Sequence, residues 1–365
     1  MRVPLPTVVR EWGRIGLIGF GGPPAHVALL RELTVDRRGW IGAREFEDAN
    51  AACQLLPGPG STQLAIYTAQ RVAGLPGAVL GGLAFILPGL LMVLAIGALA
   101  LGGAPPAWLA GIGAGGGAAV VAVIAQAGLS LARGVRSLRG AVYLAAAFAA
   151  VVLAGALVVA VILAAGLLEL AWRRRTVALH AWPVVLAAAA ALPGLAWTAL
   201  KVGALSFGGG FVTIPLMQQD AVERHGWMTG AEFLDAVAFG QLTPGPVTHT
   251  VALVGWAAAG LAGALLAALI AFAPSFLVIA LGGEGFARLR ANRDARAFLD
   301  GAGPAAVGAI LGAAVPLAQA LGEWWQLGVL AAAALLLLLR RPPLWALAGG
   351  ALTGLAVALA GGPLP

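Results

Sequence analysis

A stretch centred on Pro-Gly-Pro occurs twice in the chain, each time within a long apolar region. The first copy reads Gln-Leu-Leu-Pro-Gly-Pro-Gly-Ser-Thr-Gln at 54–63, and the second reads Gln-Leu-Thr-Pro-Gly-Pro-Val-Thr-His-Thr at 241–250. Proline removes a backbone donor and clashes with the preceding turn, at a cost of roughly 3 kcal/mol inside a helix. Each copy therefore predicts that one helix ends and another begins. In a lipid bilayer such a break is tolerated only where protein or a polar cavity surrounds it. Two matching breaks are typical of a transport site.

The composition is that of a helical membrane protein. Of the 365 residues, 61% are hydrophobic and only 10% are charged, whereas about a quarter of the residues in a soluble domain are charged. In a membrane protein, arginines set the topology, so the net charge of +7 does not indicate nucleic-acid binding. The single cysteine, Cys53, excludes an internal disulfide and a cysteine-based metal cluster.

The second half of the chain repeats the first. The Phe-Gly-Gly motif at 20–22 returns at 207–209, an offset of 187 residues. The same offset aligns residues 40–48 with 227–235, and it aligns the two Pro-Gly-Pro breaks. So many identities at one offset indicate two homologous repeats. The expected domains are the halves 1–175 and 176–365.

Each half is expected to contain the same series of segments. An apolar segment leads into the Phe-Gly-Gly turn, a polar stretch follows, and then come the broken segment and four apolar spans. In the first half these are 6–30, 31–48, 49–70, 75–101, 107–132, 139–153 and 155–172; in the second they are 183–217, 218–235, 236–256, 263–281, 299–318, 324–339 and 343–360. Residues 139–172 could form one long tilted helix, but the Arg-Arg-Pro-Pro sequence at 340–343 favours a short hairpin in both halves.

The arginines predict that the halves have opposite orientations, because Lys and Arg collect in cytoplasmic loops. The arginine-rich loops of the first half, around Arg136 and Arg173, correspond to uncharged loops in the second. The arginine-rich loops of the second half, around Arg293 and Arg340, correspond to uncharged loops in the first. The pattern predicts an inverted repeat, with the Arg136 and Arg293 loops both cytoplasmic.

The same rule makes the broken segment a re-entrant hairpin. The stretch 31–48 and Arg71 are both placed inside, so the segment 49–70 enters and leaves on one side of the membrane. This arrangement places the N-terminus outside the cell. Because the N-terminus carries Arg2 and Arg10, this placement violates the rule that Lys and Arg collect on the cytoplasmic side.

Arg14 and Lys201 occupy the same repeat position, inside the first apolar segment of each half. A charged side chain at the bilayer centre costs about 2.5–3.5 kcal/mol on insertion scales, so such residues indicate function. Both are candidates for neutralising a bound anion. The alternative is that both long side chains reach a membrane interface and serve as anchors.

The glycine-rich turns and the helix starts after the breaks supply further candidates for binding an anion. Backbone N–H groups at helix starts bind oxyanions, whereas close helix packing is the alternative role for the glycines. With Arg14 and Lys201, the candidate substrate-binding residues are Gly21, Gly22, Gly208, Gly209, Gln54, Gly60, Ser61, Thr62, Gln63, Gln241, Val247, Thr248 and His249, and the helix-breaking residues are Pro57, Gly58, Pro59, Pro244, Gly245 and Pro246.

Acidic residues beside the breaks are candidates for proton coupling. Asp48 and Asp235 form one repeat pair, and Glu45 and Glu232 form another. Such acids, and also His26, carry protons where they are partly buried. The alternatives are a helix cap or a solvated face for the glutamates and a structural role for the histidine.

These motifs closely resemble those of the chromate ion transporter family in its long, two-domain form. They are Phe-Gly-Gly-Pro-x-Ala-His at 20–26, residues 40–48 and Gln-Leu-Leu-Pro-Gly-Pro at 54–59, with counterparts at 207–210, 225–227, 232–235 and 241–246. The resemblance implies export of chromate, with sulfate as a related ligand. It also implies that the proton-motive force drives export across the inner membrane of a prokaryote.

The residues by themselves predict a transporter for a small anion. A passive anion channel and an intramembrane enzyme are the alternatives. The enzyme is disfavoured because no nucleophile–base pair or metal-ligand set is present. The expected partners are an oxyanion, protons and the lipid bilayer, and a homodimer is left open. We expect no cofactor, no metal and no nucleic acid, and we expect a multi-pass protein of the cytoplasmic membrane.

Overall fold

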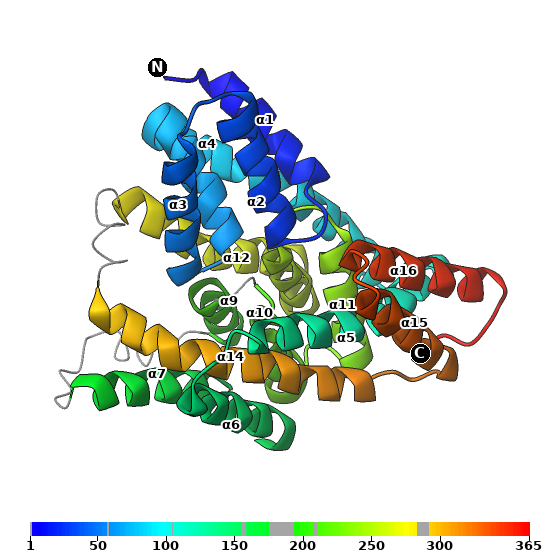
Figure 1. Ribbon diagram of the computed structural model, residues 1–365. Coiled ribbons are helices and arrows are strands. Elements are labelled where there is room, and N and C mark those ends of the chain that lie inside the picture. The colour runs from blue at the N-terminus through cyan, green and yellow to red at the C-terminus, as the bar shows by residue number, and fades with distance from the viewer. Residues whose placement is uncertain are drawn as a thin grey trace.

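The computed structural model describes residues 2–56, 58–103, 105–154, 158–174, 193–206, 210–282 and 292–365, and the regular elements in these ranges are all helical (Figure 1). The first half contains α1 (Leu5–Ile18), α2 (Pro23–Arg31), the π-helix η1 (Glu32–Arg37), α3 (Ala43–Leu55), α4 (Gly60–Ala100), α5 (Ala107–Ala132), α6 (Leu138–Ala154) and α7 (Val158–Arg174). The second contains α9 (Gly194–Leu205), α10 (Thr213–Gln218), the π-helix η2 (Gln219–Arg224), α11 (Gly230–Leu242), the 3₁₀ turn η3 (Val247–His249), α12 (Thr250–Gly282), α14 (Arg293–Gln319), α15 (Trp324–Leu338) and α16 (Pro343–Leu359).

The predicted repeat recurs in the backbone. The π-helices η1 and η2 start at the same repeat position, as do α3 and α11. Gly74 in α4 and Gly260 in α12 both adopt a left-handed φ, of 70° and 61°, and reverse the chain within what would otherwise be one long helix. Only glycine adopts this conformation readily. The chain therefore contains two homologous halves, as the sequence predicts.

The broken segment of the first half is a re-entrant hairpin, as predicted. Glu45 near the start of α3 forms an ion pair with Arg71, which precedes the reversal at Gly74. The two arms therefore run in opposite directions, and the Pro-Gly-Pro break between them lies at the tip. The hairpin begins earlier than expected, because α3 already starts at Ala43 and includes part of the polar stretch 31–48.

The prediction that the N-terminus lies on the opposite side from residues 31–48 is wrong. The backbone N–H of Val3 donates to the carbonyl of Val72 at 2.9 Å, so α1 starts beside the open end of the hairpin. The chain turns at Gly21 and Gly22 and returns through α2 to the same side, where Glu11 of α1 meets Arg37. The segment 6–30 thus enters and leaves together with the hairpin, and the expected violation of the charge rule disappears.

Within the part of the chain that the structure describes, four helices are long and apolar enough to cross a membrane: α4, α5, the η3–α12 helix and α14. Their packing interlocks the two halves. The helix α5 packs mainly on α16 of the second half and also on α11 and α15, and α14 packs mainly on α6 and α7 of the first. The two halves are therefore intertwined, and Figure 1 shows α14 lying along α6 and α7.

Small residues allow these contacts. On α5 and α16, Gly111 and Gly115 face Gly354 and Gly350 in antiparallel register, and a methyl group added at Gly350 would lie 2.5 Å from the Gly115 carbonyl oxygen. Spacings of four between small residues are typical of close helix pairs in membranes.

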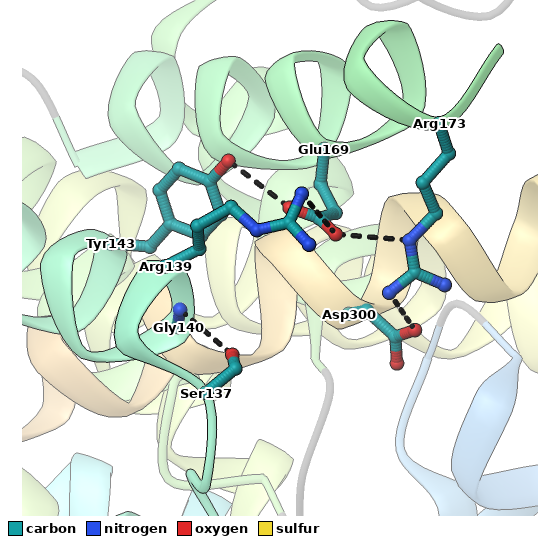
Figure 2. Close-up of polar contacts among 7 residues, drawn as sticks. All are labelled: Ser137, Arg139, Gly140, Tyr143, Glu169, Arg173 and Asp300. Carbon is teal, nitrogen blue, oxygen red and sulfur yellow. Dashed lines mark hydrogen bonds and ion pairs between the residues drawn. The ribbon is translucent and has the colours of Figure 1, made fainter.

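A buried carboxylate fastens α7 to α6 and α14 (Figure 2). Glu169 is only 3% exposed and accepts hydrogen bonds from Arg173 at 2.9 Å and from Tyr143 at 3.2 Å. Arg139 lies 3.5 Å from the same carboxylate, and Arg173 also contacts Asp300 of α14 at 2.9 Å. This cluster lies at the end where the arginine-rich loops gather.

The two halves run in opposite directions. Gly82 of the 75–100 part of α4 lies against Phe276 of the equivalent 261–282 part of α12, and the contacts of Gly58 with Ser275 and of Gly89 with Pro244 relate the halves reciprocally. Equivalent helices that cross in opposite directions are related by a two-fold axis perpendicular to them. If these helices cross the bilayer, the repeat is inverted.

The halves differ at one contact. The helix α11 packs on α5, where a methyl group added at Gly117 would lie 2.8 Å from Leu234. The equivalent position on α14 is Gly303, which has open space around it, and the described residues of α3 do not pack comparably on α14. Accordingly Asp235 on α11 is half-buried, whereas Asp48 on α3 is exposed.

We predict that Gly350→Val lowers the melting temperature of the purified protein, because overpacking a tight contact typically costs about 1–3 kcal/mol. Gly349→Val is the matched control, since nothing lies within 4 Å of a methyl group added there. Equal melting temperatures for both variants would contradict the packing of α5 on α16.

We predict that the N-terminus is cytoplasmic. Single cysteines at Arg2, Ser137 and Pro105, introduced after replacing Cys53, are treated with an impermeant maleimide in intact cells. Pro105 should react, whereas Arg2 and Ser137 should react only after permeabilisation. Labelling of Arg2 together with Pro105 would show that the first segment crosses the membrane.

Candidate functional site

Each helix break packs against the opposite half. At Gly58, whose φ is +122°, an added methyl group would lie 3.1 Å from the Ser275 hydroxyl of α12. Reciprocally, a methyl group added at Gly89 of α4 would lie 2.1 Å from the Pro244 carbonyl oxygen. The N–H of Gly245 donates to the Gly19 carbonyl at 3.0 Å. Both breaks are therefore enclosed by protein, as the membrane environment requires.

Buried polar atoms without a hydrogen-bond partner gather around the breaks. They include the hydroxyls of Thr62, Ser206 and Ser275, the amide nitrogen of Gln241 and the ring nitrogens of His249, and acceptor oxygens of Asn50, Gln219 and Asp220 also lack a partner. Buried polar groups are nearly always paired, so each exception needs a reason. Hydroxyls, an amide and an imidazole can all donate hydrogen bonds. The arrangement suits a bound group rich in acceptor oxygens.

The first Phe-Gly-Gly turn and Gly210 lie beside the second break. A methyl group added at Gly22 would contact Val247 at 3.7 Å, and one added at Gly210 would contact the same residue at 3.9 Å. His26 joins the first turn to the first break: its Nε2 lies 2.9 Å from the Gly19 carbonyl and its Nδ1 lies 3.2 Å from the Ser61 hydroxyl. Both ring nitrogens of His26 therefore already have a hydrogen-bond partner within the protein.

Lys201 is buried and already paired. Its ammonium lies 2.5 Å from a carboxylate oxygen of Asp220 on η2, which also accepts a hydrogen bond from Thr198 at 2.5 Å. Both charged side chains are almost completely buried, at 2% and 0% exposure. The pair carries no net charge, so Lys201 contributes a free cation only if Asp220 is neutralised or displaced.

Arg14 differs from its repeat partner, because its side chain is exposed. It lies outside the polar cluster at the breaks. The equivalence of Arg14 and Lys201 in the sequence therefore does not extend to their surroundings.

The candidate acids have different environments. Glu232 forms a capping box with Thr229 at the start of α11, and Glu45 pairs with Arg71. Asp235 lies against α5, where a methyl group added at Gly113 would lie 2.8 Å from its carboxyl carbon.

Other candidate positions are located as follows. Gly60 starts α4, Gln63 and Thr248 are buried near the breaks, and Pro59 and Pro246 precede the new helices. Pro57, Gly208, Gly209 and the side chain of Gln54 lie outside the described residues.

Sequence reasoning missed Asp220, Ser206 and Ser275. Their repeat partners are Leu33, Gly19 and Gly89, so a search for matching residues passes over them. A comparison of the two repeats for differences would have found them, because each is a polar residue at a position where the other half has an apolar or small residue.

An inverted pair of re-entrant hairpins whose tips each pack against the opposite half among buried polar groups defines a membrane transport protein rather than a soluble binding domain. The model of the chromate transporter family matches residues 7–170 and 193–355, which are the two repeats. The chain belongs to the chromate transporter family.

Curated relatives resemble the chain over most of its length. The chromate transport protein of Cupriavidus metallidurans is 35% identical over 86% of this chain and 83% of its own length. The chromate transport protein of Pseudomonas aeruginosa is 32% identical over 87% of this chain and 82% of its own. An uncharacterized transporter of Methanocaldococcus jannaschii is 25% identical over 73% of this chain and 72% of its own. No solved structure matches the chain.

We predict that Lys201→Met and Asp220→Leu each destabilise the protein strongly, whereas the double variant recovers much of the loss. Removing one partner of a buried pair typically costs about 3–5 kcal/mol, but replacing both can be neutral. Thermal unfolding of the four proteins gives the coupling free energy. Glu45→Gln with Arg71→Gln is the control for a more exposed pair, where we expect a coupling of at most about 1 kcal/mol. Additive losses at Lys201 and Asp220 would contradict the pair.

Proposed function

We propose that this protein transports chromate across the cytoplasmic membrane as a secondary active transporter, with sulfate as a competing ligand. The names of the relatives support chromate, and the supporting observation within the chain is the set of unpartnered polar atoms at the breaks. Thr62, Ser275 and Gln241 would donate to the oxygens of a tetrahedral oxyanion. Sulfate has the same shape and charge, so hydrogen-bond donors alone select poorly between the two ions.

The charge of the ion must also be balanced, because an isolated buried charge is very costly. Each helix start after a break contributes about half a positive charge, so the two starts balance roughly one negative charge. Lys201 is the proposed source of the remainder, once Asp220 is neutralised or displaced. Arg14, exposed on α1, is the weaker candidate.

The asymmetry between the halves favours a transporter over a passive channel. The contact between α11 and α5 closes one side of the breaks, and α3 leaves Gly303 of α14 uncovered on the other. In an inverted repeat, exchanging the conformations of the halves would close the second side and open the first. We propose that these two contacts are alternating gates and that this conformation is open to the cytoplasm, where α3 and the start of α14 lie.

Asp48 and Asp235 are the proposed coupling acids, since each lies on the moving helix of one gate. Closing a gate brings its aspartate against a neighbouring helix, and burying a charged carboxylate is costly. A proton on that aspartate would favour closure. Proton binding on either side would thereby bias the gate on that side, which links transport to the proton gradient.

Binding by the unpartnered hydroxyls is tested with Thr62→Val, which keeps the shape of the side chain. We expect chromate affinity to fall about tenfold or more, because a hydrogen bond to a charged group contributes about 1.5–3 kcal/mol, with no loss of thermal stability. Thr68→Val is the control, since the Thr68 hydroxyl donates to the Leu64 carbonyl. Unchanged affinity in Thr62→Val would contradict the proposed site.

The gates are tested with two cysteine pairs in a protein lacking Cys53. Gly117 with Leu234 should form a disulfide in this conformation, and the equivalent pair Gly303 with Glu47 should form one only in the opposite conformation. Either disulfide should stop chromate uptake into everted vesicles, and reduction should restore uptake. A channel would keep conducting with one of the pairs closed, and uptake insensitive to an uncoupler would contradict proton coupling.

A further inference from the structure

A cavity of about 150 Å³ lies between α1 and the α2–η1 segment, away from the helix breaks. Arg14, Ile15 and Ile18 line it from α1, and Leu29 and Leu33 line it from the opposite side. The proposed transport path makes no use of this cavity. Its lining combines charged side chains of both signs with an apolar wall, which is the pattern that a charged amphiphile requires.

The cavity and its rim carry excess positive charge. Arg10 and Arg14 lie one turn apart on α1, are exposed, and form no ion pair with any residue that the structure describes. Glu11 between them is held by Arg37 at 3.1 Å and by Arg38 at 3.0 Å.

A second glutamate, Glu32, lies in the wall. In the lining itself, Arg14 and Arg37 balance Glu11 and Glu32, so the excess of two positive charges comes from Arg10 and Arg38 on the rim. An anionic ligand fits this balance better than a neutral or zwitterionic one.

Neighbouring aromatic rings indicate the depth of the cavity. Trp12 stacks on Trp40 with the ring centroids 6.3 Å apart, and the guanidinium of Arg38 lies 5.6 Å from the Trp40 ring. Tryptophan gathers at the headgroup level of membranes. Trp12 is buried and Trp40 is partly exposed, so Trp40 marks this level, and the long side chain of Arg14, two residues after Trp12, can reach it.

The face of α1 beyond Arg14 is apolar and open to the surroundings. Leu17 is 54% exposed and Ile18 is 44% exposed. On a membrane protein such side chains lie against lipid tails. The cavity therefore opens to the hydrocarbon layer directly below two unpaired arginines.

We propose that an anionic phospholipid of the cytoplasmic leaflet binds in this cavity. Arg10 and Arg14 hold the phosphate, and one acyl chain lies along Ile18 and Leu29. A lipid is favoured over a free anion because the walls and the outer face are apolar. The bound lipid would support α1, whose far end at Gly19 accepts a hydrogen bond from the second break.

The test measures the melting temperature of delipidated, detergent-purified protein with added phosphatidylglycerol, cardiolipin, phosphatidylcholine or inorganic phosphate. The two anionic lipids should raise the melting temperature of the unmodified protein by several degrees, and phosphatidylcholine and phosphate should not. The shift should disappear in Arg10→Gln/Arg14→Gln and persist in Arg10→Lys/Arg14→Lys. The control is Arg133→Gln/Arg136→Gln, which removes the same charge from exposed positions at the same membrane face and should keep the shift.

Three results would overturn the proposal. The anionic lipids could stabilise Arg10→Gln/Arg14→Gln as much as the unmodified protein, or phosphatidylcholine could stabilise as well as they do. If inorganic phosphate raised the melting temperature of the unmodified protein but not that of Arg10→Gln/Arg14→Gln, the cavity would instead be a site for a free anion. Leu29→Gln gives a second check that leaves every charge in place, and it should weaken the lipid shift without changing the response to phosphate.

Discussion

A helix that stops inside a bilayer leaves backbone groups that lipid cannot satisfy, and the architecture of this protein follows from that constraint. The two Pro-Gly-Pro breaks are enclosed because each lies against the other half of the chain. The Gly245 N–H donates to Gly19 across the two halves, and the first break lies against Ser275 in the same reciprocal way. Neither half could protect its own break alone, which explains why the repeats are intertwined rather than side by side.

The same reciprocity creates a place for an anion. Around the breaks lie hydroxyl, amide and imidazole groups that have no hydrogen-bond partner within the described protein. The charged groups nearby are arranged differently from what repeat symmetry suggests. Lys201 is tied to Asp220 inside the protein, whereas Arg14 lies on the outer surface. We therefore propose that neutral hydrogen-bond donors select the anion. Lys201 contributes its positive charge only when Asp220 is neutralised or displaced.

Much of the fold could be predicted from the sequence, because the signals were local or repeated. The boundaries of α5, α6, α15 and α16 follow apolar runs and their flanking Arg and Pro residues, and the re-entrant hairpin followed from the arginines at both its ends. The sequence did not predict that α2 runs back to the side from which α1 starts. The glycines inside this apolar segment can equally indicate close packing of a continuous helix. The pair of Lys201 and Asp220 depends on residues 19 positions apart on elements with no common motif. The difference between the α3 and α11 contacts is a property of one conformation and has no sequence signal.

The central claim is that an oxyanion binds between the two helix breaks. A structure determined with chromate bound tests it most directly, because chromium scatters more strongly than any atom of the protein. The claim predicts density for the ion within hydrogen-bonding distance of the Thr62 and Ser275 hydroxyls and near the helix starts at Gly60 and Val247. Density on the outer face of α1 at Arg14, with none at the breaks, would contradict it.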